Sequence, residues 1–416
     1  MNILYIDHYA GSVRHGMEFR PYYMAREWTR LGHTVTILAA DYSHLRRENP
    51  VITKDFTTEF VDGIPYTWVK TSPYHGNGPG RARNILQFVE KVNRRAETLA
   101  QELSPDAVIA SSTYPFDIYP ARNIARRRGA VLVYEIHDLW PMTPMVLGNL
   151  PPWNPVMAVM QKAEDAAFRD ADRVISLLPA ANRHMEERAF KTGVGKEQIE
   201  KKFCYIPNGV IPEEGGAALP KQHTELLSQL RREDKFILLY AGGHARSNDL
   251  FNLLRSAKLL DDSFATVLAG DGIEKPSLQL QVKKDGIKNV YFLPSVEKRC
   301  VPALLEKADA LYFGAKKCRL YAYGMSPNKL YDYMLAAKPV IYAVEAANDP
   351  VGTSGCGLSV AASDPKAVAE AVKRLRDTPV EERIKMGEQG RAYVLKHHNY
   401  PMLAQRFLSA IHKEGR

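Results

Sequence analysis

Residues 2–40 read NILYIDHYAGSVRHGMEFRPYYMAREWTRLGHTVTILAA. The runs Ile3–Ile6 and Thr34–Ala39 are short, apolar and rich in β-branched residues, which is typical of buried strands. Between them, Arg20–Leu31 has apolar residues at helical spacing and ends at Gly32. A strand, a helix and a second strand in this order are typical of a parallel βαβ unit.

The same alternation continues along the chain. Up to residue 208 we predict three more strands and a long amphipathic helix over 85–103; the strands are Ala107–Ala110, Val131–Ile136 and Val174–Leu177. After residue 220 a second series begins, with strands at Ile237–Ala241, Ala265–Ala269, Val290–Leu293, Ala310–Phe313, Val340–Tyr342 and Leu358–Val360. Helices are predicted between them, around 250–260, 301–308, 328–337 and 366–376. The pattern predicts an α/β protein with two Rossmann-like, doubly wound parallel-sheet domains.

A chain of 416 residues exceeds the length that a single hydrophobic core usually serves, which also favours two domains. Turn residues and prolines concentrate in the segment IPNGVIPEEGG, residues 206–216, and this composition is typical of a linker. We therefore predict a first domain at 1–208, a linker at 209–222 and a second domain at 223–395. Residues 396–416 are predicted to form a C-terminal helix that packs back towards the first domain.

Composition excludes several classes of protein. With 45% hydrophobic and 25% charged residues the chain is typical of a globular protein, and it has no apolar run long enough to span a membrane. The N-terminus lacks the features of a signal peptide, so we expect a cytoplasmic location. The four cysteines form no Cys-x-x-Cys pair, which argues against a metal site. The net charge of +9 forms no basic stripe, so nucleic acid is not an expected partner.

Two segments of the first domain are candidates for ligand binding. Ligands of parallel α/β sheets lie beyond the carboxyl ends of the strands. The loop after the first strand, residues 7–20, contains Gly16, and the following helix offers N–H groups to a phosphate or sugar oxygen. His137 and Asp138 follow the strand Val131–Ile136, where a histidine can exchange a hydrogen bond with a substrate. An ordinary loop and a structural histidine remain the alternatives.

In the second domain, the segment before the helix at 328–337 predicts an anion site. Ser326 or Asn328 is expected to cap this helix, with Pro327 in its first turn. Lys329 adds a positive charge for a diphosphate, and Asp332 can accept hydrogen bonds from ribose hydroxyls. The alternative is a plain capped helix with a solvated lysine.

The loop after the strand Ile237–Ala241 repeats this arrangement. Gly242, Gly243 and His244 follow the strand, and Arg246 is a candidate phosphate clamp.

Several motifs together resemble the retaining glycosyltransferases of family 4. They are His15-Gly-Met-Glu18, Leu31-Gly-His-Thr-Val35, Ala171-Asp-Arg-Val-Ile175, Ile206-Pro-Asn-Gly-Val210, Ala269-Gly-Asp-Gly272, Asn289-Val-Tyr-Phe292 and Lys338-Pro-Val-Ile341. The resemblance implies the GT-B fold, in which two Rossmann-like domains face a central cleft. Two further motifs, His137-Asp-Leu-Trp-Pro141 and Ser326-Pro-Asn-Lys329, resemble the WbuB-like or N-acetylfucosamine transferase branch of bacterial polysaccharide biosynthesis.

This resemblance implies a retaining transfer from a nucleotide sugar, UDP-linked and carrying an N-acetylated or 6-deoxy sugar, to a saccharide or lipid-linked saccharide acceptor. It implies no cofactor, no metal and no separate general base. We assign catalysis to His137, Arg246 and Lys329. Donor binding is assigned to Gly16, Glu18, Asp138, Gly242, Gly243, His244, Ser326, Pro327, Asn328, Leu330 and Asp332.

The chain departs from the family pattern at two places. Gly324 stands where the first glutamate of the family's Glu-x7-Glu pattern is expected, with Asp332 at the second, and Asn248-Asp249 replaces the usual Lys-Gly. Two other functions therefore stay open: a UDP-sugar 2-epimerase and a non-catalytic binding subunit.

The apolar segment Leu139–Trp153 contains two tryptophans. With nearby arginines, it leads us to expect peripheral association with the inner face of the cytoplasmic membrane. The alternative is that this segment packs as a cleft wall.

Overall fold

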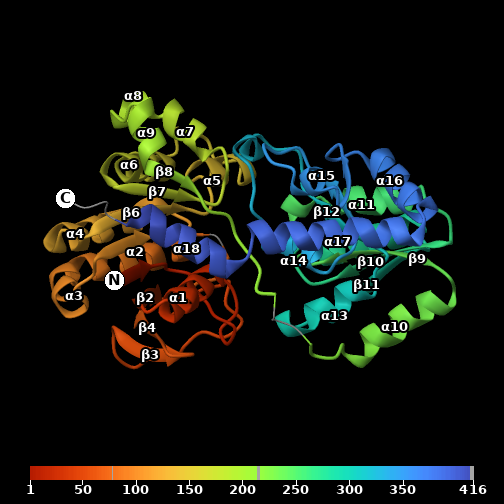
Figure 1. The fold of residues 1–416 in the computed structure, drawn as a ribbon, viewed down its shortest axis with the longest axis horizontal. Coiled ribbons are helices and arrows are strands. Elements are labelled where there is room, and N and C mark those ends of the chain that lie inside the picture. The colour runs from red at the N-terminus through yellow and green to blue at the C-terminus, as the bar shows by residue number, and fades with distance from the viewer. Residues whose placement is uncertain (77, 213–215, 413–416) are drawn as a thin grey trace. The chain divides into compact units, whose positions relative to one another are not determined.

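The computed structural model describes residues 1–76, 78–212 and 216–412, and the chain divides into two compact units (Figure 1). The first unit comprises residues 1–208 and 400–416, and the second comprises 209–399. The predicted linker, 209–222, is counted with the second unit, and its residues 213–215 lie outside the described residues. The predicted boundary between 395 and 396 falls inside a helix, α17 (Val380–His397).

The first unit is built on an eight-stranded sheet with the order β3-β4-β2-β1-β5-β6-β7-β8. The strands are β1 (Asn2–Ile6), β2 (Thr34–Ala40), β3 (Thr57–Val61), β4 (Ile64–Val69), β5 (Ala107–Ala110), β6 (Val131–Ile136), β7 (Arg173–Ser176) and β8 (Phe203–Tyr205). All neighbours are parallel except β3 and β4. Because β2 and β5 lie on opposite sides of β1, the winding reverses between β1 and β5.

Ten α-helices of the described chain belong to this unit: α1 (Arg20–Arg30), α2 (Pro79–Arg94), α3 (Ala96–Leu103), α4 (Ile118–Arg128), α5 (Met142–Leu147), α6 (Pro155–Asp170), α7 (Ala181–Glu187), α8 (Ala189–Thr192), α9 (Lys196–Lys202) and α18 (Tyr400–Ile411). The C-terminal α18 packs on α1. The fully buried Trp28 donates from its indole Nε1 to the Ala404 carbonyl at 3.1 Å, and its ring lies 5.0 Å from that of Phe407. Burial of large aromatic rings holds the last helix in the first unit.

One prediction for this unit was wrong, and one feature was missed. The helix predicted over 85–103 is two helices, α2 and α3, because the backbone at Arg95 leaves the helical conformation. The hairpin of β3 and β4 was not predicted, although Asp62 and Gly63 form its tight turn with φ of 50° and 81°. An Asp-Gly pair between two strands is a strong hairpin signal.

The second unit has a six-stranded parallel sheet with the order β11-β10-β9-β12-β13-β14. The strands are β9 (Phe236–Ala241), β10 (Phe264–Ala269), β11 (Val290–Leu293), β12 (Ala310–Gly314), β13 (Val340–Ala343) and β14 (Gly357–Val360). Its other helices are α10 (Lys221–Arg232), α11 (Leu250–Ala257), α12 (Lys275–Asp285), α13 (Val301–Glu306), α14 (Asn328–Leu335), α15 (Pro350–Ser354) and α16 (Pro365–Asp377). The winding reverses between β9 and β12.

Successive side chains of β9 point to opposite faces of this sheet, and each face has its own hydrophobic core. Ile237 and Leu239 point to the core formed with α10, α13, α14 and α17. Phe236, Leu238 and Tyr240 point to the core formed with α11, α12 and α16. Helices on both faces explain why the strands are apolar throughout. Across the described residues, no helix combines the length and apolarity that a membrane span requires.

Candidate functional site

Some of the residues that sequence reasoning selected lie at or next to the reversal points of the two sheets: Lys329 contacts β9 and β12, and His137 follows β6, the neighbour of β5. In a doubly wound sheet, the strands on either side of the reversal send their chains to opposite faces, which leaves a crevice at their carboxyl ends. In the second unit this place lies beyond β9 and β12. In the first unit it lies beyond β1 and β5.

Lys329 lies at the reversal point of the second unit. Its ammonium is 4.3 Å from the ring centroid of Tyr240, which belongs to β9, and 5.7 Å from that of Phe313, which belongs to β12. Nζ donates to Tyr240 Oη at 2.7 Å. No carboxylate of the described residues pairs with it. Burial lowers the pKa of Lys329 from its usual value to about 7.

The backbone of the neighbouring loop leaves room for this side chain. Gly242 has a φ of 151°, and a Cβ there would lie 2.5 Å from Lys329 Cε. A side chain at position 242 would therefore displace the lysine. Gly243 follows, and its carbonyl accepts hydrogen bonds from Tyr240 Oη at 2.6 Å and Asn248 Nδ2 at 2.8 Å.

The N-terminus of α14 differs from its prediction. Asn328 is the first helical residue, and Pro327 occupies the N-cap position with no side-chain hydrogen bond. The prediction that Ser326 or Asn328 caps the helix, with Pro327 in the first turn, was wrong. A helix start without a side-chain cap leaves amide groups for an anion. Leu330 faces the apolar core, and its amide donates to the Pro327 carbonyl at 3.1 Å.

Arg246 and Asp332 differ in their contacts. The Arg246 side chain is exposed and has no hydrogen-bond or ion-pair partner among the described residues. Both carboxylate oxygens of Asp332 accept a hydrogen bond from Lys298 Nζ, at 2.7 and 2.6 Å. A ribose at Asp332 would therefore share this carboxylate with Lys298.

His244 is fully buried, between the rings of Tyr240 and Phe292. Neither ring nitrogen finds a partner in the described part of the chain. Burial, helped by the charges of Lys275 and Lys329, lowers the pKa of His244 to about 4, so the ring is neutral at physiological pH.

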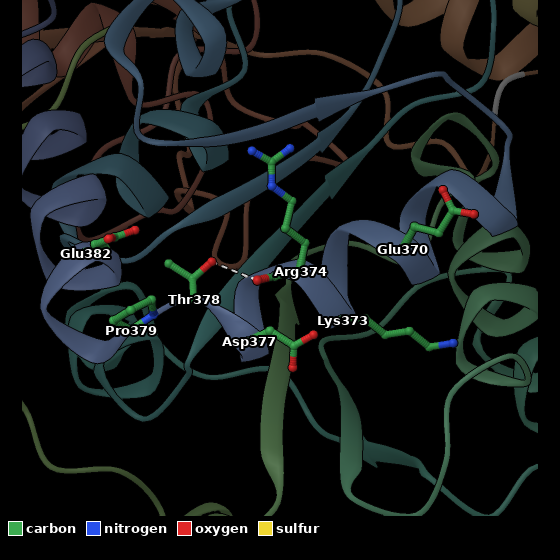
Figure 2. Close-up of a pocket in the computed structure, with 7 residues that line it drawn as sticks. All are labelled: Glu370, Lys373, Arg374, Asp377, Thr378, Pro379 and Glu382. Atoms are coloured by element: carbon green, nitrogen blue, oxygen red, sulfur yellow. Dashed lines mark hydrogen bonds between the residues drawn. The ribbon is translucent and has the colours of Figure 1, made fainter.

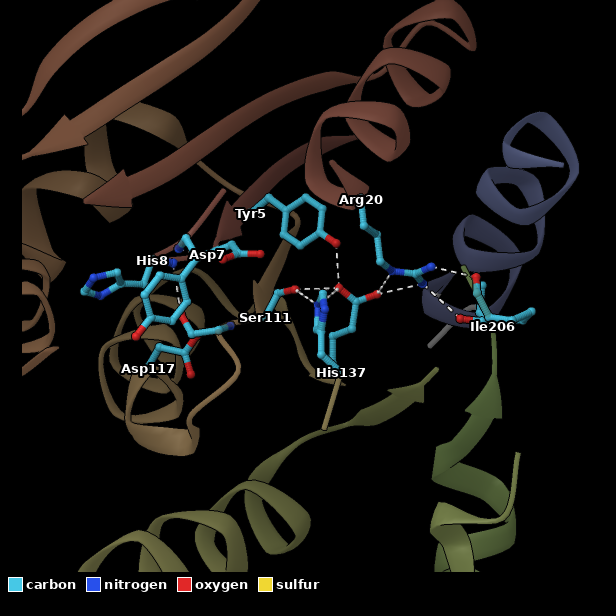
Figure 3. A network of polar contacts seen from close by, with 12 residues as sticks. Tyr5, Asp7, His8, Arg20, Ser111, Asp117, His137 and Ile206 are labelled. Atoms are coloured by element: carbon cyan, nitrogen blue, oxygen red, sulfur yellow. Dashed lines mark hydrogen bonds and ion pairs between the residues drawn. The ribbon is translucent and has the colours of Figure 1, made fainter. Parts of the chain in front are cut away.

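In the first unit, a buried carboxylate organises the site (Figure 3). Glu135, on β6, is inaccessible to solvent, and its Oε2 accepts hydrogen bonds from Tyr5 Oη and Ser111 Oγ, both at 2.5 Å. Its Oε1 accepts from Arg20 Nε at 2.9 Å. Burial alone would raise the pKa of Glu135, but Arg20 and the hydrogen bonds from His137 and Ser111 hold it well below its usual range. The carboxylate is therefore ionised.

This network orients His137. Its Nε2 lies 2.9 Å from Ser111 Oγ and 3.3 Å from Glu135 Oε2. Because Ser111 donates to Glu135, Nε2 carries a proton towards these oxygens, and Nδ1 is the nitrogen that remains for a ligand. Burial lowers the pKa of His137, but the hydrogen bond to Glu135 and the charges of Glu135, Asp7 and Glu18 outweigh it and raise the pKa. The surrounding carboxylates therefore stabilise the charged imidazolium relative to a free histidine.

Two predicted acidic residues, Glu18 and Asp138, and one that was not assigned to the site, Asp7, interact electrostatically with this histidine. Burial raises the pKa of Glu18, and burial raises that of Asp7 to about 7. Asp138 is exposed. Gly16 has a φ of 98°, and the Gly11 amide donates to the Glu18 carbonyl at 2.7 Å. The close approach in this loop is thus to its own backbone.

A shallow hollow on the second unit contains none of the predicted residues (Figure 2). It lies where α16 meets α17 and is lined by Glu370, Lys373, Arg374, Asp377, Thr378, Pro379 and Glu382. Its mixed charges offer no convergent ligand set. Throughout the described ranges, no three His, Cys, Asp or Glu side chains gather as a metal-ion site would require.

Sequence reasoning missed the residues that hold His137: Glu135, Arg20 and Ser111. Glu135 is the one charged residue in the apolar strand VLVYEI, and a buried charge requires a partner. That partner is Arg20, 115 positions away, which local patterns do not reveal.

Comparisons with known proteins agree with the fold. Residues 15–196 match the glycosyl transferase 4-like domain, and residues 223–393 match the glycosyl transferases group 1 domain. The chain is a glycosyltransferase of the GT-B type. No curated protein sequence matches the chain.

Solved structures similar to this glycosyltransferase share its fold of two Rossmann-like domains. HepE from Anabaena, in complex with UDP and glucose, is 15% identical, with a TM-score of 0.65 and 98% of each chain covered. Sucrose-phosphate synthase from Thermosynechococcus elongatus is 16% identical, with a TM-score of 0.70, covering 98% of this chain and 97% of that one. WaaG, a glycosyltransferase involved in lipopolysaccharide biosynthesis, is 15% identical, with a TM-score of 0.64 and coverage of 99% and 100%. At these identities, the likeness establishes the GT-B fold.

Proposed function

We propose that this glycosyltransferase moves a sugar, with retention of anomeric configuration, from a UDP-sugar to a saccharide or lipid-linked saccharide in cell-surface polysaccharide biosynthesis. UDP is present in the similar HepE structure, and WaaG acts in lipopolysaccharide biosynthesis. The donor sugar in our proposal is N-acetylated or 6-deoxy.

The observation that carries the proposal is the environment of Lys329. A half-buried ammonium with no carboxylate partner in the described chain, beside a helix start without a side-chain cap, is a site prepared for a negative ligand. A diphosphate supplies that charge. Arg246, which is exposed and unpaired in the described residues, offers a second cation. With these charges in place, the transfer needs no divalent metal.

In the first unit, His137 contacts the donor sugar through Nδ1. A protonated Nδ1 donates a hydrogen bond to a sugar hydroxyl and adds positive charge near the breaking bond. The departing phosphate oxygen then takes the proton of the acceptor hydroxyl on the same face of the sugar. Catalysis consists of positioning and charge stabilisation, with no separate base.

The donor sugar is connected with Gly324. This residue has φ of 98° and ψ of −177°, a conformation that glycine adopts and other residues rarely do. The backbone conformation at position 324 therefore favours glycine over a residue with a carboxylate side chain. We propose that a sugar without the corresponding hydroxyl binds at this position.

A donor panel tests the proposed function. The purified enzyme is incubated with UDP-sugars, with and without a lipid-linked saccharide acceptor, and products are analysed by NMR. We expect a product with the donor's anomeric configuration and equal rates in EDTA. An inverted product would refute retention, and isomerised UDP-sugar without acceptor would identify an epimerase. Absence of both transfer and donor hydrolysis across the panel would indicate a binding subunit.

We also propose that the first unit binds the membrane surface peripherally. Five apolar side chains on α5, α6 and the loop between them are exposed: Leu147, Leu150, Trp153, Val156 and Val159. Trp153 is 82% exposed, and tryptophan favours the membrane interface. In co-sedimentation with anionic vesicles, Trp153→Ala should weaken binding severalfold, whereas Phe190→Ala, which removes an exposed ring on α8, should not. Equal binding of both variants and wild type would contradict this surface.

A further inference from the structure

Arg20 connects the site of His137 with the end of residues 1–208, the longer of the two segments that form the first unit. Its guanidinium is fully buried and bonds Glu135 Oε1 through Nε and Nη2, both at 2.9 Å. Nη1 donates to the Pro207 carbonyl at 2.6 Å, and Nη2 donates to the Ile206 carbonyl at 3.0 Å. Ile206 and Pro207 lie close to the end of this segment at Asn208, after which the second unit begins at residue 209. Figure 3 shows one continuous chain of contacts from His137 to Ile206.

The hydrogen bonds of Glu135 leave its carboxylate one orientation. Oε2 receives Tyr5, Ser111 and His137, and Oε1 receives Arg20. A carboxylate with both oxygens saturated in this way has no freedom to rotate, and it fixes which nitrogen of His137 is turned inward. Removal of either charge would leave the other buried without a partner.

We propose that Arg20 and Glu135 are a positioning pair, which holds His137 with Nδ1 turned to the donor and fixes the Ile206–Pro207 segment in the same network. This inference rests on the proposed role of His137. Neither residue touches the donor; both act through the histidine or the backbone. The pair therefore couples the orientation of the catalytic histidine to the place where the chain leaves the first unit.

The charged groups that face His137 come from several elements. Glu135 lies on β6, the strand that His137 follows, Asp7 follows β1, Glu18 precedes α1, and Asp138 is the next residue in the chain. Arg20 faces it from α1 through Glu135. Glu135 is the member of this set within hydrogen-bond reach of the ring, so its loss should have the largest effect on the imidazole.

NMR of the enzyme labelled with ¹⁵N-histidine tests the pair without relying on activity. The His137 signal is assigned with His137→Gln, and its titration and tautomer are followed in wild type, Glu135→Gln and Glu164→Gln. Glu164→Gln is a matched control, because it removes another buried carboxylate of the first unit, which contacts His184 at 3.0 Å. Urea unfolding confirms that each variant is folded.

We expect wild type to show the Nε2-protonated tautomer when neutral. Glu135→Gln should lower the pKa of His137 by about 1 or more and mix its tautomers. It should also reduce turnover about tenfold or more while leaving the affinity for UDP unchanged. Glu164→Gln should change none of these. An unchanged pKa and tautomer in folded Glu135→Gln would overturn the positioning role. A shifted pKa in an enzyme that lacks transfer activity would support the pair and refute the proposed function.

Hydrogen exchange tests the backbone half of the proposal. Arg20→Lys keeps the charge, but one ammonium cannot bond Glu135 and both carbonyls in the geometry of the guanidinium fork. We expect amides in the segment 203–210 to exchange at least about tenfold faster than in wild type or Glu164→Gln. Equal exchange rates would refute the link to Ile206 and Pro207.

Discussion

The two units differ in whether their buried charges are paired. In the first unit, Glu135 and Arg20 neutralise each other, and hydroxyls and carbonyls satisfy the rest of their hydrogen-bonding capacity. In the second unit, Lys329 lies over aromatic rings, and its hydrogen-bond partners among the described residues are a phenol and an amide oxygen. A saturated network holds a side chain in place, whereas an uncompensated cation favours the arrival of an anion.

This contrast separates two tasks within one fold. Under the proposed function, the first unit supplies a fixed histidine, and the second supplies positive charge for the donor diphosphate. The lowered pKa of Lys329 and the raised pKa of His137 are the electrostatic signs of this difference. Removal of a charge should therefore lower stability in the first unit and lower the affinity for UDP in the second.

The largest difference is expected in stability. Arg20→Met leaves Glu135 buried without its ion-pair partner and should lower the free energy of unfolding by about 3–5 kcal/mol. Lys329→Met replaces an uncompensated cation with an apolar side chain against two aromatic rings, so no loss is expected. Urea denaturation measures both. A destabilised Lys329→Met, or a stable Arg20→Met, would remove the contrast between the units.

The second largest effect is expected on turnover, in a variant whose affinity for UDP does not change. His137→Gln should lower turnover about 100-fold, because it removes a charged donor at the reacting sugar. Its affinity for UDP should stay within about twofold of wild type, since we propose that His137 contacts the sugar and not the nucleotide. Steady-state kinetics and calorimetry give the two quantities. Weak UDP binding by His137→Gln would show that the histidine serves the nucleotide instead.

The smallest expected effect is a proton taken up on binding. The pKa of Lys329 is lowered to about 7 from 10.5, so the free amine is mostly neutral at pH 8. Bound diphosphate favours the charged form, and up to about one proton should enter with UDP. UDP affinity should fall as pH rises above about 7.

Calorimetry in buffers of different ionisation enthalpy measures this uptake. Lys329→Arg, which stays charged, should bind UDP at pH 8 without it. The same proton uptake in Lys329→Arg and wild type would assign the proton to another group.

Much of the fold was predictable because parallel strands buried on both faces are continuous apolar runs. The bounds of β5, β6 and β11 coincide with the predicted runs. The hairpin of β3 and β4 was missed because β3 is an edge strand with alternating exposure, which gives a weak apolar signal. The break between α2 and α3 was missed because their apolar residues continue the same period across Arg95.

The site was predictable only where its residues follow strands or begin helices. His137 was selected because it follows a strand, and Lys329 because it begins a helix. The Arg20–Glu135 pair joins distant parts of the sequence, so it required the fold. The burial of His244 and Leu330 follows from packing that their local patterns do not reveal.

Titration of UDP against Lys329→Met, wild type and a control lysine variant tests the central claim most directly. Lys235→Met is the control, because Lys235 immediately precedes β9 and thus lies at the opposite end of the sheet. Loss of a charged hydrogen bond costs about 1.5–3 kcal/mol, so Lys329→Met should bind UDP about 10- to 150-fold more weakly, and Lys235→Met should bind like wild type. Equal affinity of Lys329→Met and wild type would contradict the assignment of Lys329 to the donor diphosphate.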